Sequence, residues 1–307
     1  MSRYHYEGAA SPQPKALANS NCRDSFARRR MREDLVFLAV LILLFALIFA
    51  LCRGIYHVLH SEDEIVSLSA TSEPLLQSGR DEAGQSGSQD LTDDQKRDYI
   101  LSHSDRYPQI LQELVQKNEE TIDFVYQYPS AASSESVSLN AEEISGGVPL
   151  LLQWDSRWGY CTYGTGLIGY TGCGPTCLSM VVAGLTGNAA ATPAAIAAYA
   201  EQSGYYSSGT GTTWALMSEG CQHYGLLAEE LSLSEKDMIS ALSSGRPIIA
   251  SVGPGDFTDA GHFIVITAYS DGAFTVHDPN SRQRSQKNWS FETLCTQIKN
   301  LWAFEKN

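Results

Sequence analysis

An uncharged apolar run of 18 residues divides the chain into two unequal parts. The run, LVFLAVLILLFALIFALC, extends from Leu35 to Cys52 and contains no Gly and no Pro. A helix of this length nearly crosses a hydrocarbon core of about 30 Å, and the flanking residues complete the span. The run is apolar on every face, which argues against a core helix, and no small-x-small cleavage site follows it. The sequence therefore predicts one transmembrane signal-anchor helix over residues 35–55.

Arginines on one side of this run predict its orientation. The segment RDSFARRRMRED before the run holds five arginines, whereas Arg53 is the only one just after it. Because basic residues favour the cytoplasmic side of a membrane, residues 1–34 are expected to form a cytoplasmic tail. We therefore expect a single-pass protein of the cell membrane whose C-terminal part is extracytoplasmic.

The part of the chain after the run is acidic. From Arg53 onward it carries 14 basic and 31 acidic residues. Nucleic-acid recognition requires basic patches that attract phosphates, so this balance argues against a nucleic-acid partner.

Composition divides the outer part into four segments. Residues 56–90 are rich in Ser, Gly, Gln and acidic residues, which is typical of a disordered stalk. Residues 91–128 have the pattern of a helical spacer, with a capping box at Thr92 and Gln95 and with Pro108 suited to the first turn of another helix. Residues 129–147 resemble a linker. Residues 148–307 contain all five tryptophans and have the composition of a globular domain.

The pattern within residues 148–307 predicts helices first and an antiparallel sheet last. Helices are expected from Cys173 to about Gly187, over 192–203 and over 234–244. The segment RPIIASV predicts a strand, and HFIVITAYSDGAFTVHD predicts a hairpin that turns at residues 270–272. SRQRSQK, over 281–287, is expected to be a solvated loop. This order indicates the α+β fold class.

The cysteines of the outer part leave two questions open. There are five, an odd number, so at least one thiol is unpaired and the other four form two disulfides or none. They are Cys161, Cys173, Cys177, Cys221 and Cys295. No second Cys pair and no His pair at finger-like spacing accompanies them, so neither a metal nor another cofactor is predicted.

Cys173 has the sequence surroundings of a reactive thiol. Gly172 and Gly174 allow close backbone approach, and Pro175 is tolerated in the first turn of a helix. A helix N-terminus stabilises a thiolate through its dipole and its unpaired N–H groups. Cys177 lies one turn further along among apolar residues and is expected in the core. These residues alone leave Cys173 open as either a nucleophile or a structural thiol.

His262 and Asp278 are candidate partners of this thiol. If the hairpin turns through a three-residue loop, Tyr269 pairs with Ala273, and His262 and Asp278 become diagonal neighbours on one face. A two-residue turn would bring His277 to that face instead. The three-residue loop is our hypothesis because it brings a carboxylate to the imidazole.

Several motifs together resemble the C-39-like cysteine peptidases of the papain-like superfamily. They are, in chain order, QWDSRWGY, GCGPTCLSMV, GTTW, GHFIVI and HDPN. The segment YPQILQELVQKNEETIDFVYQYP also resembles the region that precedes this domain in membrane-anchored members from Gram-positive bacteria. The resemblance covers about half the chain, from Val148 to the C-terminus.

The resemblance implies a papain-like fold with a Cys-bearing central helix packed on an antiparallel sheet. It implies that Cys173 is the nucleophile, that His262 is the general base and acid, that Asp278 orients the imidazole, and that Gln153 donates to the oxyanion. The family's leader peptidases carry this Gln only a few residues before the Cys, whereas Gln153 precedes Cys173 by 20 residues. The leader peptidases are also fused to transporter domains that this sequence does not contain.

The leading hypothesis is a membrane-anchored extracytoplasmic thiol hydrolase that acts on a peptide or protein substrate. Two alternatives remain. The first is a papain-like binding module without turnover, which the complete set of Cys, His, Asp and Gln disfavours. The second is a peptidoglycan amidase or endopeptidase acting on cell-wall peptides, for which no wall-binding repeat is present.

Overall fold

Six antiparallel strands form the central sheet of the computed structural model, which describes residues 91–131 and 137–307. The strand order is β5-β10-β6-β7-β8-β9. The strands are β5 (Leu226–Glu230), β6 (Ile248–Val252), β7 (His262–Ser270), β8 (Ala273–His277), β9 (Asn288–Trp289) and β10 (Ile298–Lys306). Two short ribbons pair β1 (Thr162–Tyr163) with β2 (Gly166–Leu167), and β3 (Tyr206–Ser207) with β4 (Gly211–Thr212).

Several helices begin where the sequence offers capping groups. Thr192 and Ser234 accept hydrogen bonds from the first turns of α8 and α10, and Thr92 forms a complete capping box with Gln95. The longer helices are α2 (Asp93–Ser102), α3 (Gln109–Lys117), α7 (Cys173–Thr186), α8 (Pro193–Gln202) and α10 (Glu235–Ser243). The shorter ones are α4 (Ile122–Gln127), α5 (Ala141–Ser145), α6 (Ile168–Thr171), α9 (Ala215–Ser218), α11 (Arg282–Ser285) and α12 (Phe291–Cys295). The helices and the central strand predicted in residues 173–252 are thereby confirmed.

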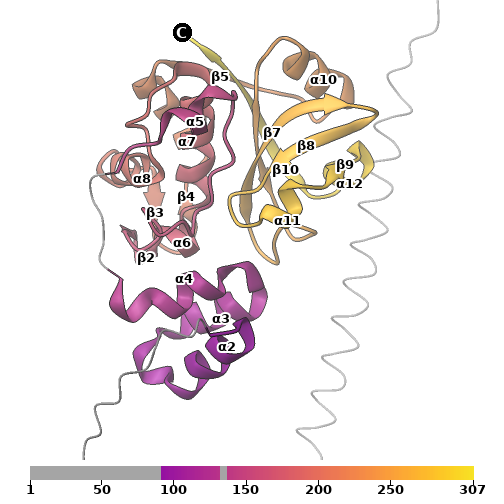
Figure 1. Cartoon of the computed structure of the whole chain (residues 1–307). Helices are drawn as coiled ribbons and strands as arrows, with labels where there is room; N and C mark the ends of the chain where they lie inside the picture. The colour runs from indigo at the N-terminus through magenta and orange to yellow at the C-terminus, as the bar shows by residue number, and fades with distance from the viewer. Residues whose placement is uncertain (1–90, 132–136) are drawn as a thin grey trace, which may run out of the picture. The chain divides into compact units, whose positions relative to one another are not determined.

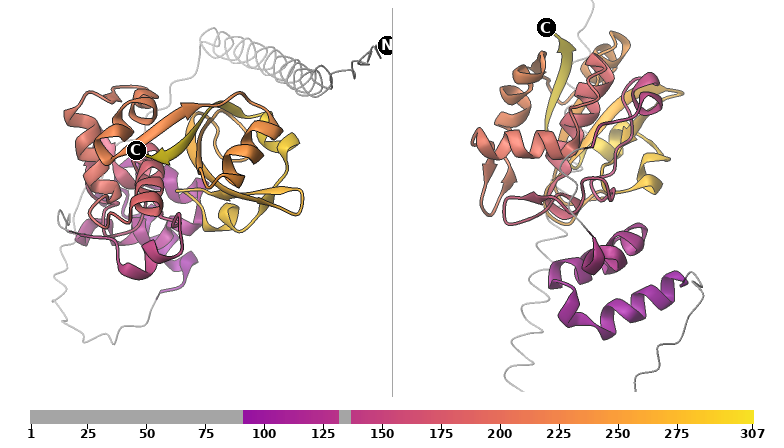
Figure 2. Two further views of the ribbon diagram at one scale, coloured as in Figure 1. Left: turned by 90° about the horizontal axis from the view of Figure 1, so that it is seen from above. Right: turned by 60° about the vertical axis from the view of Figure 1, so that its left-hand side comes forward.

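Both faces of the sheet are covered. Ile249 and Val265 belong to the core that contains α7 and α8, whereas the alternate residues Ile248 and Ile264 belong to a second core with α10 and α12. This is the period-two alternation of a strand, with each face of the pleat meeting a different layer. Figure 1 shows α7 and α8 on one side of the sheet and α10 and α12 on the other, and the left view of Figure 2 shows the same separation. The domain is therefore a mixed helix and antiparallel-sheet fold.

The helical segment of residues 91–131 packs against the start of the domain. Its core residues share a cluster with Leu152 and Trp154, and the Phe124 ring of α4 stacks on Tyr160 with centroids 4.4 Å apart. Residues 137–147, which fall within the expected linker, contain α5 and the buried side chain of Leu139. The part of the expected linker that the structure describes is therefore packed on the domain.

The hairpin between β7 and β8 corrects our prediction of its turn. Ser270 pairs with Ala273, so the loop has two residues, Asp271 and Gly272, with φ of 52° and 80°. Positive φ at both positions is the requirement of a type I′ turn. A bulge at Thr267 then shifts the register by one residue, so that Val265 pairs with His277. The predicted three-residue loop is wrong. The bulge adds one residue to β7 instead, and this restores the predicted register beyond it, with His262 and Asp278 on one face of the hairpin.

The predicted membrane span at residues 35–55, the tail before it and the stalk after it lie outside the residues that the structure describes. Within residues 91–131 and 137–307, none of the helices has both the length and the apolar character needed to cross a bilayer.

Candidate active site

Cys173 is the first residue of α7. Gly172 precedes it as the N-cap, and Cys177 lies one turn further along with no exposed surface. The small neighbours are required by packing, because a Cβ at Gly174 would lie 2.7 Å from the Thr212 side chain and one at Gly172 would lie 2.6 Å from the Ile168 carbonyl oxygen. Glycine on both sides of Cys173 therefore lets the start of α7 pack closely against Ile168 and Thr212.

His262 connects Cys173 to Asp278. Its Nε2 lies 2.8 Å from Asp278 Oδ1, and its ring also forms a hydrogen bond with the Cys173 thiol. Since Nε2 is engaged by the carboxylate, Nδ1 is the ring nitrogen available to sulfur. His262 is buried at 8% exposure and Asp278 at 0%. The structure therefore brings together three of the four site residues that the sequence analysis selected.

Asp278 is surrounded by donors on both oxygens. Oδ1 accepts the backbone N–H of Asn280 at 2.7 Å in addition to the imidazole, and Oδ2 accepts the Nε–H of Arg284. A buried carboxylate is tolerated only with such partners. Burial alone would raise the pKa of Asp278, but the charges and hydrogen bonds of His262 and Arg284 outweigh it and lower the pKa. Asp278 is therefore ionised and oriented toward the imidazole.

The electrostatics favour a thiolate–imidazolium pair. Burial acts to raise the pKa of the Cys173 thiol, yet the hydrogen bond and charge of His262, together with the N–H groups of Phe263 and Gly174, lower it below its usual 9.0. Burial acts to lower the pKa of His262, but Asp278 and the thiolate raise it above its usual 6.5. These opposite shifts stabilise the charged forms of both partners at neutral pH.

Gln153 is buried between the segment that precedes Cys173 and the segment that follows Asp278, and its side-chain amide contacts backbone carbonyls. Nε2 donates to the carbonyl oxygens of Gly169 and Tyr170 at 3.1 and 3.2 Å, and the Gln153 N–H donates to the Pro279 carbonyl at 2.7 Å. Its Oε1 is buried, and no hydrogen-bond partner for it occurs among the described residues. In this arrangement Gln153 ties the segment before Cys173 to the segment after Asp278, and its side-chain Nε2 donates to backbone carbonyls.

Arg284 is a site residue that the sequence analysis missed. It lies in the segment expected to be a solvated loop, but residues 282–285 form α11 and its guanidinium contacts Asp278. The sequence offered no signal to separate Arg284 from Arg282, which lies over the Trp154 ring at 4.5 Å.

Two further thiols and His277 take no part in this arrangement. Cys177 and Cys221 are buried thiols whose pKa values are raised by burial. His277 is on the opposite face of the hairpin, where Nδ1 contacts the Pro149 carbonyl oxygen at 3.2 Å. Within the described part of the chain, no three His, Cys, Asp or Glu side chains are grouped to hold a metal ion.

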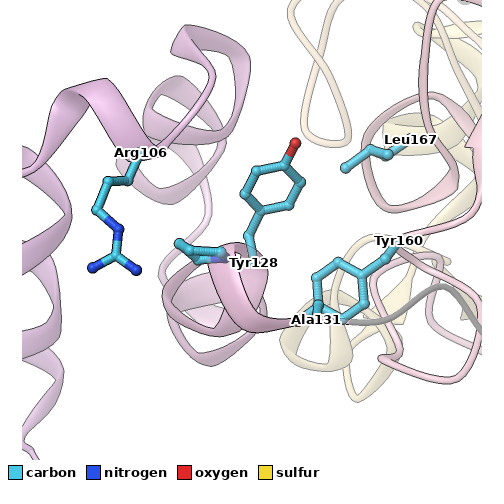
Figure 3. Close-up of a pocket in the computed structure, with 6 residues that line it drawn as sticks. Arg106, Tyr128, Ala131, Tyr160 and Leu167 are labelled. Atoms are coloured by element: carbon cyan, nitrogen blue, oxygen red, sulfur yellow. The ribbon is translucent and has the colours of Figure 1, made fainter.

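A surface depression of about 570 Å³ lies apart from Cys173, His262 and Asp278 (Figure 3). The residues that line it are Arg106, Tyr128, Pro129, Ala131, Tyr160 and Leu167. In Figure 3 the Tyr128 hydroxyl points toward Leu167, and none of the three linked site residues lies in the depression.

The family of the chain follows from its sequence and agrees with this geometry. Residues 146–306, about half of the chain, match the model of the Peptidase_C39 like family. The chain belongs to that family. The match includes Cys173, His262 and Asp278, and it begins after the helical segment of residues 91–131.

Two solved structures are similar to this C39-like chain. The peptidase domain of Streptococcus ComA, described as a bi-functional ABC transporter involved in quorum sensing, is 19% identical, with 45% of this chain and 93% of that one covered and a TM-score of 0.36. A C39-like peptidase from Bacillus anthracis is 14% identical, with 56% and 99% covered and a TM-score of 0.31. No curated protein matches the sequence.

Proposed function

We propose that this C39-like protein is a cysteine peptidase that hydrolyses peptide or other amide bonds. The observation that carries the proposal is the continuous hydrogen-bonded connection from the Cys173 thiol through His262 to the buried carboxylate of Asp278. A nucleophile, a base and an orienting acid in this order are the functional parts of a covalent hydrolase. A binding module would have no need of a thiol with a lowered pKa paired to a buried imidazole.

The reaction follows from the charges of the pair. The Cys173 thiolate attacks the carbonyl carbon, and the imidazolium of His262 gives its Nδ1 proton to the leaving amine as the C–N bond breaks. The thioester that remains is attacked by water, from which His262 removes a proton. The tetrahedral intermediate formed by this attack then breaks its C–S bond, which releases the carboxylic acid product and restores the thiolate. Asp278 keeps the ring orientation fixed through both steps.

Oxyanion stabilisation is assigned to the start of α7. The first N–H groups of a helix have no intrahelical acceptor, and the helix dipole adds to their attraction for negative charge. Cys173 stands at this helix start, so the carbonyl oxygen of a substrate bonded to its sulfur would be adjacent to these N–H groups. Gln153, whose Nε2 donates to two backbone carbonyl oxygens, contributes by holding the neighbouring segment.

We further infer that the peptidase domain is held outside the cell membrane by the span at residues 35–55. The support is the uncharged run and the five arginines that precede it. The substrate would then be an extracytoplasmic peptide, protein or cell-wall peptide rather than a cytoplasmic one.

Product analysis tests this function. The full-length chain would be incubated separately with a mixture of unstructured peptides and with purified cell wall, and new amine termini would be identified by mass spectrometry. The expected result is amide hydrolysis that is absent with Cys173→Ala and His262→Ala. Products from the cell wall alone would assign the murein substrate, and equal products with Cys173→Ala would refute a cysteine peptidase.

A further inference from the structure

The loop that carries Asp278 is held from outside by the helical segment. A short 3₁₀ turn, Glu119–Thr121, links α3 to α4. From this turn the Glu120 carboxylate accepts hydrogen bonds from the Ser281 hydroxyl and from the N–H groups of Arg282 at 2.9 Å and Gln283 at 3.3 Å. One side chain thus binds three donors at the start of α11, about 160 positions further along the sequence.

The side chain of Asn118, the N-cap of this turn, binds a residue between Asp278 and α11. Asn118 Nδ2 donates to the carbonyl oxygen of Asn280 at 2.6 Å. The Trp154 indole N–H donates to the same oxygen at 3.2 Å. The Asn280 peptide is therefore fixed on its carbonyl side by the helical segment and by the first loop of the domain.

The segment fixed by these contacts donates hydrogen bonds to Asp278. The N–H of Asn280 donates to Asp278 Oδ1, and Arg284, which is held in α11, donates to Oδ2. Each oxygen of Asp278 therefore has a donor from the short segment that Glu120 and Asn118 hold in place. Figure 1 shows α3 and α4 beneath α11.

We propose that Glu120 is a positioning residue for the Cys173–His262–Asp278 site, so that the helical segment is part of the catalytic apparatus rather than a spacer. The inference rests on the proposed function. It is independent of the family match, which begins at residue 146.

Docking of the helical segment alone would not require this carboxylate. The segment already packs through its apolar cluster, and Phe124 lies directly over the backbone of Gly159 and Gly169. Glu119 provides a matched comparison in the same turn, because it is exposed and its one ion pair within the described residues is with Arg97, at 3.6 Å. An exposed pair of that kind contributes little stability.

The test is the alkylation rate of Cys173 by iodoacetamide at neutral pH in the full-length protein, measured by peptide mass spectrometry. Glu120→Gln is expected to lower this rate about tenfold, less than the roughly 100-fold that a 1 Å misplacement can cost. Glu119→Gln should leave the rate unchanged. The low-field proton resonance of the His262 Nε2–H is expected to broaden or disappear in Glu120→Gln, while the melting temperature stays close to that of the wild type.

The outcomes separate the two proposals. Wild-type reactivity at Cys173 that is no greater than in His262→Ala would refute the proposed function itself. Strong wild-type reactivity that Glu120→Gln leaves intact, with the resonance unchanged, would refute the role of Glu120 alone. If Glu120→Gln does not fold, Asn118→Ala is measured instead, and the same loss of rate and resonance is expected; its absence would overturn the inference.

Discussion

At the scale of single residues, the site depends on two opposing effects on each ionisable group. Burial favours the neutral forms of Cys173, His262 and Asp278, and their mutual charges and hydrogen bonds favour the ionised forms. The second effect prevails for all three groups because the charges alternate from thiolate to imidazolium to carboxylate. Each of the three groups therefore helps to keep the other two ionised.

The alternation of charges predicts a bell-shaped pH dependence. Activity should appear as pH rises through the lowered pKa of Cys173, below 9.0, and should be lost as pH rises through the raised pKa of His262, above 6.5. Asp278→Asn removes the charge that raises the imidazole pKa, so its alkaline limb should move to lower pH by about 1–3 units. The measurement is the rate of amide hydrolysis, as kcat/KM against pH, because the leaving amine needs the His262 proton. An alkaline limb at the same pH in both proteins would contradict this account of His262.

Substitution of Gln153 distinguishes two roles for it, a structural tie between segments and the oxyanion donor that the family resemblance implies. Gln153→Ala removes the side-chain donor from the buried carbonyl of Gly169 and the partly buried carbonyl of Tyr170, so we expect a loss of about 1–3 kcal/mol in the free energy of unfolding. The hydrolysis rate should fall modestly. Urea unfolding and initial rates measure the two effects. A fall of about 100- to 1000-fold in kcat at unchanged stability would instead identify an oxyanion donor.

At the scale of elements, the sequence predicted what local signals determine. The caps Thr192 and Ser234 and the left-handed Gly187 after α7 gave helix boundaries that the structure reproduces. The hairpin was predicted but not its details, since Asp271-Gly272 also suits a two-residue turn and nothing in FIVITAY identifies a bulge at Thr267. Two errors, in loop length and in strand regularity, offset each other because each moves the register by one residue.

The contacts of Arg284 and Glu120 could not be predicted. Cys173, His262 and Asp278 were selected from a helix start, from the pairing of one hairpin and from the family resemblance, whereas the roles of Arg284 and Glu120 depend on where α11 and the turn before α4 meet. Exposed acidic and basic residues have the same appearance in a sequence whether they are solvated or paired. The spacing of such residues therefore carries no information about their partners.

The contact between α4 and α6 gives a prediction at this scale. A Cβ at Gly169 would lie 2.4 Å from Phe124 Cζ and 3.1 Å from the Gly159 carbonyl oxygen. Gly169→Ala should therefore lower the free energy of unfolding by about 1–3 kcal/mol through overpacking. At Gly146, which has a φ of −91°, an added Cβ meets no atom within 4 Å. Gly146→Ala is the matched control and should be nearly neutral in thermal unfolding; equal effects of the two substitutions would contradict the packing described.

At the scale of the whole molecule, residues 91–307 form one unit of the chain, and the predicted span lies before it. The proposed topology predicts that the full-length protein sediments with membranes and resists alkaline carbonate extraction. Replacing three residues of the span, Leu43, Leu44 and Phe45, with Lys should abolish this behaviour, since each charge at a span centre costs about 2.5–3.5 kcal/mol. Membrane fractionation with antibody detection measures it. Carbonate-resistant sedimentation of the triple variant would place the anchor elsewhere.

The central claim is that Cys173 is the activated nucleophile of a cysteine peptidase, and covalent labelling tests it most directly. A thiol-directed activity probe is added to the native full-length protein, and the labelled site is identified by mass spectrometry in the wild type, Cys173→Ala and Cys177→Ala. The account predicts one rapid label, at Cys173, that is absent in Cys173→Ala and unchanged in Cys177→Ala. Rapid labelling that persists in Cys173→Ala would contradict it.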